Sequence, residues 1–288
     1  MYQGSFVSLI TPFDKKLEVD NKRLQELVLW HLDERSDGLL VGCVAGEGSS
    51  LNIEEKQHLL KIVLGVTKKN MPVILACDGL NFRDSILLTK QAKALGADGC
   101  SIAIPSYSKS EELKCFQYFY EISKVGLPLI ICHNPQTYGI KLSANVLSEL
   151  STLPCIIGIQ EGSGEASITE DILSRCSTTI FSSQDAATRF LMQKGAQGSI
   201  SNIANVIPSL WARLVSFYFN KEYDKALFLQ KKYQQLSDAL TLEYVPLSVK
   251  YALSLTQKCT PYIRAPALPL QESSQEAIKK AMKLLSLI

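Results

Sequence analysis

The chain has very little net charge and no long hydrophobic run. Its 288 residues carry 30 basic and 28 acidic side chains, spread along the sequence, which gives a net charge of +2. This balance provides no electrostatic footprint for nucleic acid or for an anionic membrane surface. No apolar run approaches the ~20 residues that a membrane-spanning helix needs. We therefore expect neither nucleic acid nor a membrane as a partner.

We also expect no secretory signal peptide. Residues 1–10 lack both a basic segment and the long apolar segment that a signal peptide contains. The sequence therefore predicts a cytoplasmic protein.

The eight cysteines include no Cys-x-x-Cys pair. Several of them, such as Cys77 and Cys132, close apolar runs that are typical of strands, which favours buried, reduced thiols over disulfides. A metal site built from Cys43, Cys77, Cys132 and His133 is an alternative, because these residues all end strands. Small core cysteines explain the pattern more simply, and we expect no metal and no cofactor.

What the sequence does contain is a regular alternation of two patterns. Short apolar runs rich in β-branched residues alternate with stretches of 3.6-residue periodicity, and Asn52 and Ser143 provide helix-capping signals. The expected strands are 6–10, 38–43, 72–77, 99–104, 127–132, 155–160, 178–182 and 197–201, and the expected helices include 21–34, 53–67, 83–95, 111–125, 144–150 and 185–194. Eight such units predict a (β/α)8 TIM barrel. An open doubly wound sheet is the alternative, but it usually carries a Gly-rich turn after its first strand, which Thr11-Pro-Phe-Asp14 is not.

Three further helical patterns follow the eighth unit without a strand between them. They cover residues 221–240, 246–256 and 274–285, and a Pro-rich link at 260–269 separates the last two. The sequence therefore predicts a barrel over residues 1–220 and a C-terminal three-helix extension over residues 221–288. The extension is too small for a core of its own and should pack on the barrel.

In the stretch from Cys155 to Gly164, the predicted strand ends in a residue with an amide side chain. Gln160 falls at the carboxyl end of the sixth strand, where barrels of this type place their chemistry. Its side chain both donates and accepts hydrogen bonds, but it is neither a nucleophile nor a base near neutral pH.

Other polar motifs also fall at strand ends. The Gly-rich turn 42–50 could hold a small anion on its backbone N–H groups or be an ordinary turn. Cys132 and His133 end the fifth strand, but neighbouring strand residues point to opposite faces, so His133 alone is the better acid–base candidate. Tyr107, in the loop after the fourth predicted strand, either transfers protons or only packs against its neighbours. Residues 198–202, at the eighth strand, supply backbone and hydroxyl groups to the same end of the predicted barrel.

Taken together, these stretches resemble one family along the whole chain. They are Tyr2–Ser5 with Thr11–Asp14, Gly46-Glu47, Pro105-Ser-Tyr107, His133-Asn-Pro135 with Gly139, Gly158-Ile-Gln160-Glu161, Gly198–Asn205 and Arg264–Pro269. The family is that of dihydrodipicolinate synthase and N-acetylneuraminate lyase, which are class I pyruvate aldolases. The resemblance implies a TIM barrel assembled as a homo-tetramer, a dimer of tight dimers.

The resemblance also implies a Schiff-base site, from which this chain departs. The family's pyruvate-condensing lysine corresponds to Gln160. Of the three hydroxyls in its proton relay, a threonine corresponds to Ala45, a tyrosine to His133, and a tyrosine from a neighbouring subunit is retained as Tyr107. The arginine that receives the second substrate's carboxylate corresponds to Thr137.

The predicted pocket is therefore less polar than the family's and has no fixed cation. Val44, Ala45 and Ile200 are expected to line it with His133 and Gln160, and the backbone N–H groups of the Val44–Ala45 turn remain available to a carboxylate. A small 2-oxo acid or another small carboxylate is the expected ligand.

Two functions are compatible with this pattern. The first is a dihydrodipicolinate synthase-like protein without Schiff-base machinery, which binds a small carboxylate or regulates an active relative. The second is a lyase, namely a 4-hydroxy-tetrahydrodipicolinate synthase or a related 2-oxo acid lyase, that works by non-covalent acid–base chemistry through residues such as Tyr107 and His133.

Overall fold

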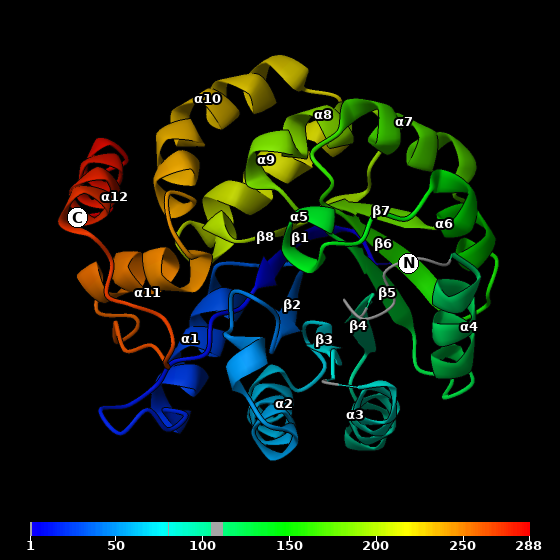
Figure 1. The fold of residues 1–288 in the computed structure, drawn as a ribbon. Coiled ribbons are helices and arrows are strands. Elements are labelled where there is room, and N and C mark those ends of the chain that lie inside the picture. Colours follow the sequence, from blue (N-terminus) through cyan, green and yellow to red (C-terminus); the bar gives the residue numbers. More distant parts are fainter. Residues whose placement is uncertain (1, 80, 105–111) are drawn as a thin grey trace.

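The computed structural model describes residues 2–79, 81–104 and 112–288, and its eight parallel strands close into a barrel (Figure 1). Each strand pairs with the next in sequence, and the last pairs with the first. The strands are β1 (Gly4–Ser8), β2 (Gly38–Val41), β3 (Val73–Ala76), β4 (Gly99–Ala103), β5 (Leu129–His133), β6 (Ile156–Glu161), β7 (Thr179–Ser182) and β8 (Gly198–Ser201). This confirms the predicted (β/α)8 barrel and excludes the open sheet.

Helices alternate with the strands and form the outer layer (Figure 1). They are α1 (Asn21–Asp33), α2 (Ile53–Thr67), α3 (Phe82–Leu95), α4 (Glu112–Ser123), α6 (Ala144–Ser151), α7 (Ala166–Arg175), α8 (Thr188–Gln193) and α9 (Pro208–Phe219). The predicted cap of α2 is present, because Asn52 Oδ1 accepts from Glu55 N at 2.8 Å and Glu55 Oε2 accepts from Asn52 N at 3.0 Å. The helix predicted over 185–194 instead begins as a 3-10 turn, η3 (Asp185–Ala187), before α8.

Side-chain alternation along the strands decides which residues fill the barrel. Phe6 and Phe181 meet inside it edge to face, with ring centroids 5.4 Å apart. Gly38 leaves room for this pair, because a Cβ at its position would lie 2.1 Å from the Phe6 ring. These two aromatic rings therefore fill part of the interior, and smaller side chains line the rest.

The C-terminal segment forms the three predicted helices, α10 (Tyr223–Leu240), α11 (Val245–Leu255) and α12 (Glu272–Leu284). They lie together at one side of the barrel, where α10 packs on α9 and α12 packs on both α10 and α11 (Figure 1). The domain boundary at residues 220/221 stays a prediction. Among the described residues, no helix is both long and apolar enough to cross a bilayer.

Candidate functional site

A cavity of about 350 Å³ opens at the carboxyl ends of the strands. Strand ends and the loops that follow them supply most of its wall, and α10 and α11 complete one side. Its lining consists of Ser8, Leu40, Cys43, Val44, Ala45, Ala76, Asp78, Ser101, Cys132, Asn134, Gln136, Thr137, Tyr138, Gln160, Ser183, Gln184, Asp185, Ala186, Asn202, Ser237, Asp238, Thr241 and Val245. The cavity therefore lies where a TIM barrel places its chemistry.

Gln160 lines this cavity, at the carboxyl end of β6. The side chain is only 7 % exposed. Its Nε2 donates to Ser183 Oγ at 2.9 Å, and its buried Oε1 has no hydrogen-bond partner among the described residues. The amide is thus fixed by a neighbour on the β7 side.

The prediction that His133 lines the pocket is wrong, and the reason is strand alternation. In the β5–β6 register Cys132 is opposite Gln160 and His133 is opposite Glu161. Cys132 and Gln160 therefore face the cavity, whereas His133 and Glu161 face away from it. The position predicted for His133 in the cavity wall belongs to Cys132.

His133 instead takes part in a fully buried network outside the cavity. Its Nδ1 lies 2.6 Å from Glu161 Oε2, and its Nε2 accepts from the backbone N–H of Leu142 at 3.2 Å. The other oxygen of Glu161 accepts from Ser163 N at 2.8 Å and from the Ser163 hydroxyl. This network joins the loops that follow β5 and β6, which suits a role in holding the cavity walls in place.

Tyr138 and Asp78 are cavity residues that the sequence analysis missed. Tyr138 ends α5 (Pro135–Tyr138), a single turn capped by Asn134, whose side chain accepts from Thr137 N at 3.2 Å. Asp78 follows β3, and its Oδ1 accepts from Ala103 N at 2.5 Å. An acidic residue directly after an apolar strand was a usable signal for Asp78, whereas Tyr138 depends on the geometry of the α5 turn.

Asp78 and Tyr138 influence each other's ionisation. Burial raises the pKa of Asp78, and the nearby charge of Lys56 and hydrogen bonds from Ala103 and Tyr138 partly offset that rise. Burial also raises the pKa of Tyr138 well above its ordinary value, and the charge of Asp78 adds to that rise. The phenol therefore stays protonated and serves as a donor beside a carboxyl group that accepts.

Asp185 is a second buried carboxyl group in the cavity wall. Its Oδ2 accepts from Ile203 N at 2.9 Å. Burial raises its pKa to about 6, against hydrogen bonds from Ser201 and from the backbone of Ile203 and Asn202. A carboxyl group that titrates near neutral pH in a cavity is a candidate for proton transfer.

The cavity thiols are not nucleophiles. Burial raises the pKa of Cys43 and of Cys132, so both stay protonated at neutral pH. In the described part of the chain, no group of three or more His, Cys, Asp or Glu side chains is arranged to hold a metal ion.

The remaining predicted site residues are placed as follows. Val44, Ala45 and Thr137 line the cavity. Ile200 is buried in the core but is not among the residues that line the cavity. Tyr107 lies outside the described residues.

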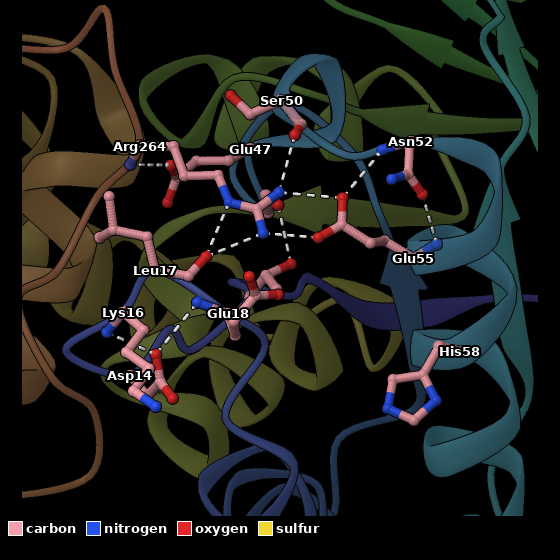
Figure 2. Close-up of polar contacts among 12 residues, drawn as sticks. Asp14, Lys16, Leu17, Glu18, Glu47, Ser50, Asn52, Glu55, His58 and Arg264 are labelled. Atoms are coloured by element: carbon pink, nitrogen blue, oxygen red, sulfur yellow. Dashed lines mark hydrogen bonds and ion pairs between the residues drawn. The ribbon is translucent and has the colours of Figure 1, made fainter.

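A buried ion cluster anchors the turn that carries Val44 and Ala45. Glu47 pairs with Lys250 of α11, and Glu47 Oε2 accepts from the backbone N–H of Arg264 at 3.0 Å. The Arg264 guanidinium in turn binds Glu55 and the carbonyl oxygen of Ser50, as Figure 2 shows. The C-terminal segment therefore fixes one wall of the cavity.

Known proteins are similar to this chain over its full length. Two are named 4-hydroxy-tetrahydrodipicolinate synthase: one from Geotalea uraniireducens is 32 % identical and one from Thermodesulfovibrio yellowstonii is 29 % identical, each covering the whole of both chains. The chloride-inhibited dihydrodipicolinate synthase of Acinetobacter baumannii, solved with pyruvate, superposes with a TM-score of 0.97 at 31 % identity over all of both chains. The Aquifex aeolicus dihydrodipicolinate synthase superposes with a TM-score of 0.96 at 26 % identity over 99 % of each chain. The profile of the dihydrodipicolinate synthetase family matches residues 1–285, and the chain belongs to this family.

Proposed function

We propose that this protein is a lyase of its family that acts on a small carboxylate without forming a Schiff base. The reaction class is that of 4-hydroxy-tetrahydrodipicolinate synthase or a related 2-oxo acid lyase. Full-length similarity to enzymes of that name supports the class. The pyruvate in the Acinetobacter structure makes 2-oxo acids the first ligands to test.

The observation that carries the proposal is the pairing of Asp78 with Tyr138 in a cavity whose described lining residues include no lysine. Asp78 is a carboxyl group with a raised pKa, and Tyr138 is a protonated phenol beside it. Such a pair can take a proton from a bound ligand and return one to it. This assignment replaces His133, whose side chain faces away from the cavity.

The turn at Val44 and Ala45 supports the carboxylate part of the proposal. Both residues line the cavity, and backbone N–H groups at such a turn suit a carboxylate without a charged side chain. The Glu47 cluster keeps the turn in one conformation, so the site is pre-organised.

Turnover on a panel of 2-oxo acids and their aldol adducts, followed by NMR, tests the proposal. The full chain should turn over at least one member, and Asp78→Asn or Tyr138→Phe should lower the rate by about 10²–10³-fold. Tyr120→Phe, at an exposed position on α4, is the matched control and should retain the rate. Borohydride trapping with pyruvate should yield no adduct in intact mass. A trapped adduct on the wild-type chain would contradict the proposal.

A second candidate function is a non-catalytic small-carboxylate-binding or regulatory protein. The fixed amide of Gln160 favours it, because this residue cannot supply the covalent step. Saturable ligand binding with no turnover on the whole panel would favour this second function over the first.

We also propose that the protein is a cytoplasmic homo-tetramer. The resemblance to the family and the sequence features described above support this, and light scattering of the purified chain tests the assembly. A mass four times that of one chain is expected, and a monomer at micromolar concentration would contradict it.

A further inference from the structure

Helix α2 buries a lysine within its apolar face. Lys56 is only 4 % exposed. Leu60 and Val63 follow it on the same buried face, at the spacing of a helix stripe that packs on a core. An apolar side chain would suit this position for packing alone. The charge of Lys56 therefore needs an explanation other than packing.

The ammonium group of Lys56 is held by backbone oxygens. Its Nζ donates to the carbonyl oxygen of Asp78 at 2.9 Å and to that of Ala76 at 3.4 Å. In the described part of the chain it forms no ion pair, whereas the buried Lys250 pairs with Glu47. A buried charge that is not neutralised by a direct partner acts strongly on ionisable groups around it, because the protein interior screens it poorly.

Asp78 is an ionisable group that this charge reaches. Burial raises the pKa of the Asp78 carboxyl, and the charge of Lys56 is the largest opposing effect, ahead of the hydrogen bonds from Ala103 N and from the Tyr138 hydroxyl. The Cys132 thiol also lies nearby, and burial keeps it protonated. Among the described groups that act on the Asp78 carboxyl, Lys56 is the only cation.

Lys56 lies on the side of Asp78 that is away from the ligand cavity. It lines a second cavity, of about 400 Å³, and is not among the residues that line the first. Asp78 and Tyr138 line both cavities, so they form part of the wall between them. A ligand in the first cavity would therefore contact Asp78 and Tyr138 without contacting Lys56.

We propose that Lys56 is a positioning residue for the proposed reaction, whose ammonium group fixes the loop after β3 and keeps Asp78 ionised as the proton acceptor. The inference rests on the proposed function only for the role of Asp78 as the base. A carboxyl group must be ionised before it can take a proton from a ligand. Without a cation beside it, a buried carboxyl group stays protonated to higher pH.

The pH dependence of kcat tests the inference on the full chain, with a 2-oxo acid or aldol adduct that the wild-type chain turns over. Lys56→Met fills a similar space without the charge. Its acidic limb should move to higher pH by about one unit, while KM stays within about twofold and the rate recovers above the limb. Lys56→Arg keeps the charge and should keep the wild-type limb. Lys61→Met, at an exposed position on the same helix, is the matched control and should change neither. An equal loss of rate at every pH in Lys56→Met would show a structural role and overturn the inference.

Infrared difference spectroscopy measures the same effect without turnover, and the amide band of the same spectra reports whether each variant is folded. The carboxyl band of Asp78 is identified by its loss in Asp78→Asn. Its titration should move to higher pH in Lys56→Met and stay unchanged in Lys61→Met. An unchanged titration in folded Lys56→Met overturns the inference even where the lyase activity is found. A shifted titration in a chain that turns over no 2-oxo acid upholds the effect of Lys56 on Asp78 while the proposed lyase function fails.

Discussion

At the scale of single residues, Gln160 occupies the position that the family resemblance assigns to the Schiff-base lysine, and an amide cannot condense with a carbonyl group. The rest of the cavity is neutral or acidic, so a lysine introduced at this position would have carboxylates in its surroundings and no competing cation in the described lining. Burial would lower the pKa of that lysine, against the opposing effect of the nearby carboxylates, and so favour the free amine that condenses with a carbonyl group.

The first prediction follows from that environment. Gln160→Lys should form a borohydride-trappable pyruvyl adduct, seen by intact mass, while the wild-type chain and Gln160→Met should not. Turnover should remain low, since the two relay hydroxyls that the family resemblance assigns to Ala45 and His133 are missing. Absence of an adduct on a folded Gln160→Lys variant would mean that the cavity does not admit pyruvate.

His31 provides a second prediction, this time for stability. It is fully buried on α1, its Nδ1 lies 3.2 Å from Ser36 Oγ, and burial with the nearby charge of Lys258 lowers its pKa to about 3. The unfolded chain binds a proton at His31 below about pH 6.5, whereas the folded chain does not until about pH 3. The contribution of His31 to stability is therefore complete above pH 6.5 and is lost as the pH falls toward 3.

Urea unfolding from pH 4 to 7 measures this effect. In His31→Gln the free energy of unfolding should fall less steeply with decreasing pH than in the wild-type chain, by up to about 1.4 kcal/mol for each pH unit. His58→Gln, at an exposed position on α2, should keep the wild-type slope. Parallel curves for His31→Gln and the wild-type chain would contradict the linkage.

At the scale of elements, β5 shows what the sequence could and could not predict. The run that ends at Cys132 and His133 correctly predicted a strand, and alternation correctly predicted that the two side chains face apart. Which of the two faces the cavity depends on the register with β6, and a shift of one residue exchanges them. Tyr138 was missed for a similar reason, since only the short α5 turn brings it to the cavity.

Contacts between segments that are far apart in the chain also could not be predicted from the sequence. Glu47 and Lys250 are 203 residues apart, and each alone reads as an ordinary surface charge. In the structure both are buried, at 1 % and 0 % exposure, and the Lys250 ammonium also lies 4.0 Å from the centroid of the Phe13 ring. The periodic patterns predicted the barrel because they are local in the sequence. The pairing of Lys250 in α11 with Glu47 in the turn after β2 is not local, so no pattern indicated it.

The third prediction uses this ion pair. Lys250→Met should lower the free energy of unfolding by about 3–5 kcal/mol, because it leaves the Glu47 carboxylate buried without its cation. The double variant Glu47→Gln/Lys250→Met should recover most of that loss, which denaturant unfolding of the four proteins in the cycle measures. Additive losses in the double variant would show that the two side chains stabilise the fold independently.

At the scale of the whole molecule, the C-terminal helices and the barrel depend on each other. Residues of α10 and α11, among them Ser237 and Val245, complete the cavity wall, and Lys250 neutralises Glu47. We therefore expect the full chain to unfold in one cooperative transition, even though the sequence predicts a barrel over 1–220 and a separate extension.

A shortened chain that ends at residue 220 tests this dependence and is the fourth prediction. It should lose the cooperative thermal transition seen by circular dichroism and calorimetry, because it exposes the apolar surface of α9 and leaves Glu47 buried without its cation. A chain that ends at Leu285 is the control and should melt like the full chain, since it lacks only the last three residues. A cooperative transition in the 220-residue chain at the temperature of the full protein would show instead that the barrel is an independent folding unit and that the extension merely packs on it.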